Sequence, residues 1–139
     1  MAKLLKTNTK AKKRVSRGPT PMAHARRVMM IHSAAERDSE VEKLRKHAES
    51  DSNNSEWAQD VLKYLEKLQE EREMLVERAL SSMDVDSAQQ EVLQMRYGVI
   101  GLEPKEIADR SSISMRQVNQ ILKAQGKYVE ELLINHLAP

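Results

Sequence analysis

The chain has 139 residues, of which 32% are charged, three are Tyr, one is Trp and none is Phe. These counts exclude a large aromatic core, and the scarcity of Gly and Pro favours an all-α protein whose core is built from Leu, Ile, Val, Met and Ala. The absence of cysteine excludes disulfides, thiolate metal ligands and a cysteine nucleophile.

The net charge of +2 conceals a strong segregation of charge along the chain. Residues 1–35 carry nine basic and no acidic side chains, and residues 36–86 carry eight basic and fifteen acidic ones. Residues 87–139 carry six of each. Such a pattern is typical of a basic arm attached to an ordinary protein body.

Residues 1–22 are expected to form a disordered basic arm, because they mix Lys, Arg, Thr, Gly and Pro with few apolar side chains. Its basic residues would neutralise DNA phosphates and add salt-dependent affinity that is blind to sequence: Lys10, Lys12, Lys13, Arg14 and Arg17. The alternatives are a solubilising tail or a cluster that meets an acidic protein surface. The arm lacks the apolar run of a signal peptide, and no window is apolar enough to span a bilayer, so we expect a cytoplasmic protein without membrane contact.

Residues 23–50 are expected to be helical, as one helix or two, but their uneven apolar content leaves their packing open. The polar stretch "SDSNNS" (50–55) breaks the pattern, and Asn53 or Ser55 suits the N-cap of the next helix.

A long amphipathic helix is predicted over 53–83. Its apolar residues recur at steps of three and four: Trp57, Val61, Tyr64, Leu65, Leu68, Leu75 and Ala79. The helix either packs along the C-terminal helices or pairs through residues 56–82 with a second copy, as a short coiled coil in a homodimer.

The last part of the chain, 86–137, is predicted to be a three- to four-helix domain. "SSMDVDS" (81–87) marks its start, with Asp84 or Asp86 as N-cap. Helices are expected over 86–97, 103–110 and 114–124. Gly126 should end or kink the third of these, and "KYVEELLINHL" continues as helix.

The stretch "KEIADRSSISMRQVNQILK" (105–123) has the pattern of a helix-turn-helix. Pro104 suits the first turn of the first helix, and Ile107 and Ala108 face inward. Ile113 anchors the turn, and Ser114 is a good N-cap for the second helix. That helix has one apolar stripe formed by Val118, Ile121 and Leu122.

The opposite side of this second helix carries side chains suited to base edges and phosphates. Those expected to read bases are Met115, Arg116, Gln117, Asn119 and Gln120, and those expected near phosphates are Lys105, Ser114 and Lys123. The alternative is an ordinary helical hairpin whose polar face contacts only solvent.

Residues 91–133, "EVLQMRYGVIGLEPKEIADRSSISMRQVNQILKAQGKYVEELL", resemble region four of bacterial sigma factors. "VLQMRYG" is similar to the first helix of that family, and the Ser-x-x-x-Val-x-Gln-Ile pattern from Ser114 to Ile121 is the most specific element. The length and layout also resemble the small late-operon transcriptional activators of phages. The resemblance implies a DNA-reading helix-turn-helix and RNA polymerase as a partner.

The chain departs from the family pattern at three positions. Ser111 stands where the family usually has a large apolar residue, and Ser112 stands where it usually has Gly, which would tolerate the turn at no steric cost. Met115 replaces a frequent Arg at the start of the recognition helix. These departures predict a less rigid turn and weaker phosphate anchoring than in that family.

The leading hypothesis is a sequence-specific regulator of transcription that binds double-stranded DNA. One alternative is a small DNA-packaging (terminase small) subunit that forms a ring, although its DNA-binding unit would be expected before the oligomerising helices. The other is a sigma mimic that binds RNA polymerase without DNA. No residue pattern predicts catalysis, a cofactor or a metal site; the histidines are scattered and lack metal-ligand spacing.

Overall fold

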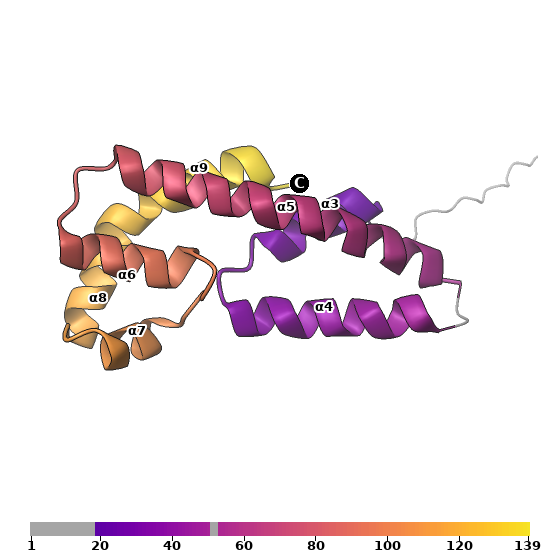
Figure 1. The fold of residues 1–139 in the computed structure, drawn as a ribbon, viewed down its shortest axis with the longest axis horizontal. Helices are drawn as coiled ribbons and strands as arrows, with labels where there is room; N and C mark the ends of the chain where they lie inside the picture. Colours follow the sequence, from indigo (N-terminus) through magenta and orange to yellow (C-terminus); the bar gives the residue numbers. More distant parts are fainter. Residues whose placement is uncertain (1–18, 51–52) are drawn as a thin grey trace, which may run out of the picture.

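The computed structural model describes residues 19–50 and 53–139, and within these ranges the chain forms helices and no strand, as expected of an all-α protein. Helix α5 runs along the length of the molecule, with α3 and α4 beside one half of it and the C-terminal helices gathered at the other end (Figure 1). Most of the predicted arm, including Lys10, Lys12, Lys13, Arg14 and Arg17, lies outside the described residues. In the described part of the chain, no helix combines the length and apolarity needed to cross a membrane.

The segment predicted as one or two helices forms two, α3 (Pro21–Met29) and α4 (Ala34–Glu49). Helix α3 begins inside the segment assigned to the arm because Thr20 caps it, accepting a hydrogen bond from the Ala23 amide at 3.2 Å, and Pro21 occupies its first turn. Ser33 caps α4 in the same way.

Helix α5 (Ser55–Ser82) matches the predicted long helix, but its N-cap is Asn54 rather than Asn53 or Ser55. The Ser55 hydroxyl instead donates to the Ala48 carbonyl at 2.8 Å, near the end of α4. Ser55 therefore helps to join the two helices rather than to start the second one.

The apolar side of α5 is covered by α3, α4 and α9 (Lys127–Leu137). Its buried apolar residues are Ala58, Val61, Leu65, Leu68, Leu75, Val76, Ala79 and Leu80. Of the predicted stripe, only Tyr64 is exposed, with 36% of its surface accessible. Since the stripe is occupied within the chain, a homodimeric coiled coil through residues 56–82 would have to displace α3, α4 or α9.

The C-terminal helices lie close to their predicted positions: α6 (Ser87–Tyr97), α7 (Pro104–Arg110) and α8 (Met115–Ile121). Asp86 is the N-cap of α6, in a capping box with Gln89. Helix α8 does not end at residue 124; it passes through a π-helical turn, η1 (Leu122–Gly126), directly into α9. Gly126 thus lies at a local change of helical winding rather than at a helix end.

Arg72 is the one charged side chain buried in the middle of α5 among the described residues, with 1% of its surface exposed. Its guanidinium donates to the Met29 carbonyl at 2.9 Å and to the Tyr97 carbonyl at 3.2 Å. These are the last residues of α3 and α6, where helix carbonyls lack intrahelical partners and carry partial negative charge. Arg72 therefore joins two helix C-termini to α5.

A second link connects the two halves of the molecule at Gly101, whose carbonyl accepts a hydrogen bond from the Ala34 amide at 2.9 Å. Gly101 has φ of +54°, and a Cβ there would meet the Ala34 nitrogen and the His32 oxygen at 2.7 Å. The loop between α6 and α7 can therefore dock on the start of α4 only with glycine at this position.

Candidate nucleic-acid interface

The first helix of the predicted helix-turn-helix, α7, begins at Pro104 and ends at Arg110. Ile107 is fully buried, and Ala108 packs partly buried beside it, as expected. Ser111 ends the helix: its amide donates to the Ile107 carbonyl at 2.9 Å, and its buried hydroxyl donates to the same oxygen at 2.6 Å. This pairing explains how a serine is accommodated where the resembling family usually has a large apolar residue.

Ser112 does not need the conformational freedom of the glycine that the resemblance led us to expect. Among the described residues, no residue other than glycine has a positive φ. The turn "SSIS" is therefore closed in conformations that serine adopts without strain.

Helix α8 begins with a capping box between Ser114 and Gln117. The Ser114 hydroxyl accepts from the Gln117 amide at 3.2 Å, and the Ser114 amide donates to the Gln117 side-chain oxygen at 3.2 Å. The predicted cap is confirmed, and it engages two residues that were also expected to contact DNA. The side-chain nitrogen of Gln117 takes no part in the box.

A small apolar cluster holds α8 against α6 and α7. Its buried members are Val92, Leu102, Ile107 and Val118, with Ile113, Ile121 and Leu122 packed partly buried around them. Val118 has no exposed surface and lies at the centre of the inner side of α8. The cluster fixes both the position of α8 and its rotation about its own axis.

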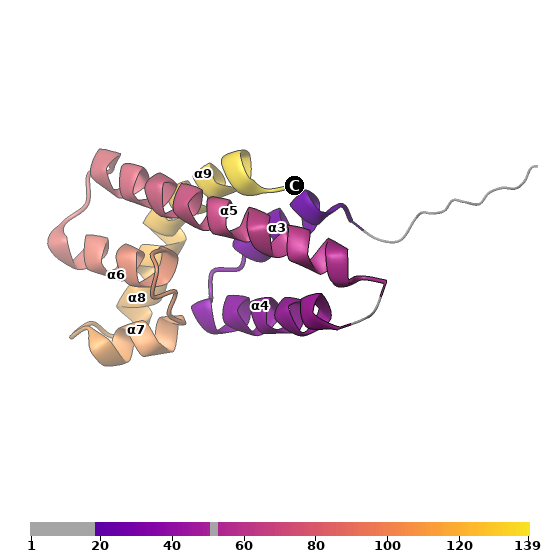
Figure 2. The ribbon, with the colours of Figure 1, turned by 45° about the vertical axis from the view of Figure 1, so that its right-hand side comes forward.

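The outer side of α8 carries every residue expected to read bases. These residues are exposed: Met115, Arg116, Gln117, Asn119 and Gln120. Lys105 at the start of α7, Ser114 in the turn and Lys123 in η1 are exposed as well. Figures 1 and 2 agree that α7 and α8 lie at the end of the molecule away from the joined ends of α4 and α5, so the first half of the described chain does not cover α8.

The charge of this surface is nearly balanced. Four basic side chains are exposed on α7, α8 and η1: Lys105, Arg110, Arg116 and Lys123. Three acidic ones are exposed at or on α7: Glu103, Glu106 and Asp109. The helix-turn-helix alone therefore offers few net charges for phosphate binding.

Tyr97, Gly126 and Glu130 support α8 from behind. The buried Tyr97 hydroxyl donates to the Glu130 carboxylate and lies against Gly126, where a Cβ would come within 2.6 Å of it. Burial, together with the hydrogen bond to Glu130, raises the pKa of Tyr97, so the phenol stays protonated. This contact fixes the path of the chain directly after α8.

The roles of Arg72 and Glu130 were not predicted from the sequence. Arg72 lies four residues after Leu68 and three before Leu75, and this helical spacing alone places it on the buried side of α5. Glu130 offered no comparable signal, because a glutamate near a helix start is ordinarily solvated.

His32 packs beside this support at the boundary of the two halves. Its ring lies edge-on to Tyr97 with centroids 5.1 Å apart, and its Nδ1 is 3.4 Å from the Arg72 guanidinium. Burial, followed by the charge of Arg72, lowers the pKa of His32 to about 4, so its ring is neutral. Within the described ranges, no group of His, Asp and Glu side chains has an arrangement that could hold a metal ion.

Comparisons with known proteins place this chain in no family: no family model matches it, and neither does any curated protein or solved structure.

Proposed function

We propose that this protein is a sequence-specific regulator of transcription whose helix α8 enters the major groove of double-stranded DNA. The observation that carries the proposal is the two-sided character of α8. Val118, on the inner side of the helix, is fully buried, while Arg116, Asn119 and Gln120 are exposed on its outer side. Arg, Asn and Gln are the side chains that form paired hydrogen bonds with guanine and adenine edges.

The support behind α8 favours this function over that of a solvated hairpin. A reading helix must present its side chains at a fixed position and angle. Here the capping box fixes the start of the helix, and the contact between Tyr97 and Gly126 fixes its exit.

The near-balanced charge of the helix-turn-helix implies that phosphate contacts come from elsewhere as well. The basic segment 1–18, with seven Lys and Arg and no acidic residue, would supply sequence-independent affinity. The resemblance to sigma region four suggests RNA polymerase as a further source of binding energy, in keeping with the few base contacts that one helix-turn-helix can make.

Selection of bound duplexes from a random pool tests the proposal. The wild-type chain should recover a consensus, and Arg116→Ala and Gln120→Ala should each lose preference at particular positions, with roughly tenfold or greater loss of affinity for the selected site. Lys123→Ala should weaken binding to all sequences alike and make its salt dependence shallower.

Glu131→Ala serves as the matched control, because Glu131 is exposed on α9 outside the proposed interface. If the proteins are folded and recover no consensus at low salt, the proposal of sequence-specific binding is wrong. If both α8 variants recover the same consensus as the wild type, another part of the chain reads the bases.

A further inference from the structure

Met115, the first residue of α8, is a large apolar side chain that remains in contact with solvent. Its exposed fraction is 43%, and it belongs to neither of the two apolar clusters in the described part of the chain. The residues of α8 and η1 that pack against α6 and α7 are Val118, Ile121 and Leu122. Met115 is therefore not needed to hold α8 in place.

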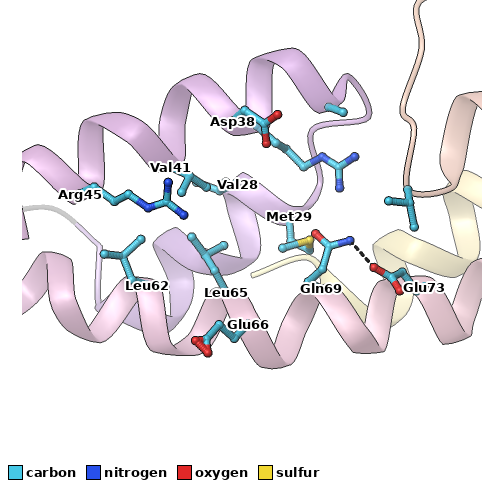
Figure 3. Close-up of a pocket in the computed structure, with 13 residues that line it drawn as sticks. Val28, Met29, Asp38, Val41, Arg45, Leu62, Leu65, Glu66, Gln69 and Glu73 are labelled. Atoms are coloured by element: carbon cyan, nitrogen blue, oxygen red, sulfur yellow. Dashed lines mark hydrogen bonds between the residues drawn. The ribbon is translucent and has the colours of Figure 1, made fainter.

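Two other exposed apolar side chains, by contrast, lie beside hollows of the molecule. A hollow of about 630 Å³ between α4 and α5 is faced by Val41 and Leu62 from its two helices (Figure 3), and the exposed Val99 also lines it. Met74, which is exposed on α5, lines a second hollow together with Val99. Met115 lines neither hollow, so its apolar surface is available to a molecule that meets the outer side of α8.

The position of Met115 in α8 is one from which a side chain can reach the bases. In a helix-turn-helix, the N-terminal residues of the recognition helix contact base edges in the major groove. Met115 directly follows the N-cap Ser114 and lies four residues before Asn119. Since residues four apart share one side of a helix, the two exposed side chains lie on the same side of α8. A duplex contacted by Asn119 therefore also meets Met115.

The chemistry of the Met115 side chain restricts what it can recognise. Its thioether has no hydrogen-bond donor and is only a weak acceptor. Among the groups that the four unmodified bases present in the major groove, the C5-methyl group of thymine is the one apolar group. The unbranched side chain of methionine has three rotatable bonds and adapts to small apolar partners. A base contact by Met115 is therefore a contact with a methyl group.

We propose that Met115 reads thymine, by packing its side chain against the C5-methyl group of a thymine in the major groove. The inference rests on the proposed function and adds the identity of one base in the recognised site. Asn119, whose amide suits adenine, lies about 6 Å further along the helix axis. Because base pairs are stacked about 3.4 Å apart, the thymine should lie within about three base pairs of the position that Asn119 reads.

Replacement of thymine by uracil tests this contact directly. The duplex is the consensus that the wild-type protein recovers from the random pool. Each thymine of the consensus is replaced in turn by 2′-deoxyuridine, which removes the methyl group and keeps the base pairing. At one position the replacement should weaken binding of the wild type about fourfold, the factor expected when the burial of one methyl group is lost.

Variants of Met115 assign the effect to this side chain. Met115→Ala should bind the thymine and uracil duplexes equally well at that position, and so should Met115→Gln, in which a polar amide of similar length replaces the thioether. Met74→Ala is the matched control, because Met74 is exposed on α5 outside the proposed interface, and it should keep the full fourfold difference. Since neither methionine belongs to an apolar cluster, all three variants should unfold at nearly the same urea concentration as the wild type.

The outcomes separate this inference from the proposed function. If the wild type binds the thymine and uracil duplexes equally at every position, or if Met115→Ala keeps the fourfold difference, Met115 does not read thymine, although sequence-specific binding stands. A consensus that contains no thymine overturns the inference in the same way. If no consensus is recovered at all, the proposed function is wrong and the inference falls with it.

Discussion

The hydroxyl of Tyr97 on α6 donates a hydrogen bond to the carboxylate of Glu130 on α9, across the turn that links α8 to α9. A Cβ on residue 126 would come within 2.6 Å of the same hydroxyl, so Gly126 leaves the space that this arrangement needs. One polar contact thereby couples α6 to the end of α8.

This relationship predicts that the effect of Gly126→Ala on the unfolding free energy changes sign when Tyr97 is also replaced. In the wild type, Gly126→Ala should destabilise the protein, because its Cβ would lie 2.6 Å from the Tyr97 oxygen. In a Tyr97→Phe background the nearest ring atoms are 3.4 Å away, so the same change should stabilise by up to about 1 kcal/mol, as Ala is the better helix former. Urea unfolding of the four proteins gives the coupling energy, and additive effects would contradict the contact.

Arg72 should be among the most sensitive positions of α5. Arg72→Met removes the donors to the Met29 and Tyr97 carbonyls and leaves both oxygens buried, which should cost about 2–4 kcal/mol of unfolding free energy. Arg78→Met, on the exposed side of the same helix, should change it by less than about 0.5 kcal/mol. Equal stability of the two variants in urea would show that Arg72 does not join the helix ends.

His32 should make stability fall in acid. Its pKa is lowered to about 4 in the folded protein from an ordinary value of 6.5, so the folded state binds the proton less readily than the unfolded state. This contribution is fully present above pH 6.5 and is lost as the pH falls toward 4, with a size of at most about 3 kcal/mol.

The neutral variant His32→Asn isolates this contribution from the titration of carboxylates. Asparagine keeps a side-chain acceptor near Arg72 but does not titrate, so the fall in unfolding free energy between pH 7 and pH 4.5 should be shallower than in the wild type. Identical slopes in the two proteins would show that the His32 ring is as accessible to protons when folded as when unfolded.

Gln117 offers a way to separate the stability of α8 from its binding of DNA. Gln117→Glu keeps a residue that completes the capping box with Ser114, so the melting temperature should stay close to that of the wild type. The new negative charge would face the polyanionic DNA at a position expected to read bases, and it should reduce DNA affinity by about tenfold or more. Gln117→Ala should lose both the cap and the affinity, and unchanged binding by Gln117→Glu would place DNA elsewhere.

Local signals in the sequence were sufficient to predict the helices of the C-terminal domain. Pro104 and Ser114 mark the starts of α7 and α8 through chemistry that acts within one turn, and Val118 is placed inward by its spacing from Ile121 and Leu122. These features need no knowledge of the rest of the chain.

Features that depend on distant contacts could not be predicted in the same way. The link from Gly101 to Ala34 and the contact of Tyr97 with Gly126 join residues far apart in sequence, so no local pattern specifies them. The N-cap of α5 was predicted wrongly because the Ser55 hydroxyl is used by Ala48 at the end of α4. The exposed state of the α8 residues follows from the structure, and their role in DNA binding stays a prediction.

Titration of the isotope-labelled full-length protein with a random-sequence DNA duplex, followed by amide chemical shifts, tests most directly whether α8 faces DNA. We predict that the largest shifts in the described part of the chain occur from Ser114 to Gln120 and at Lys105 and Lys123, and that they diminish as salt is raised. Shifts confined to α3, α4 and the exposed side of α5, or no shifts at low salt, would contradict the account.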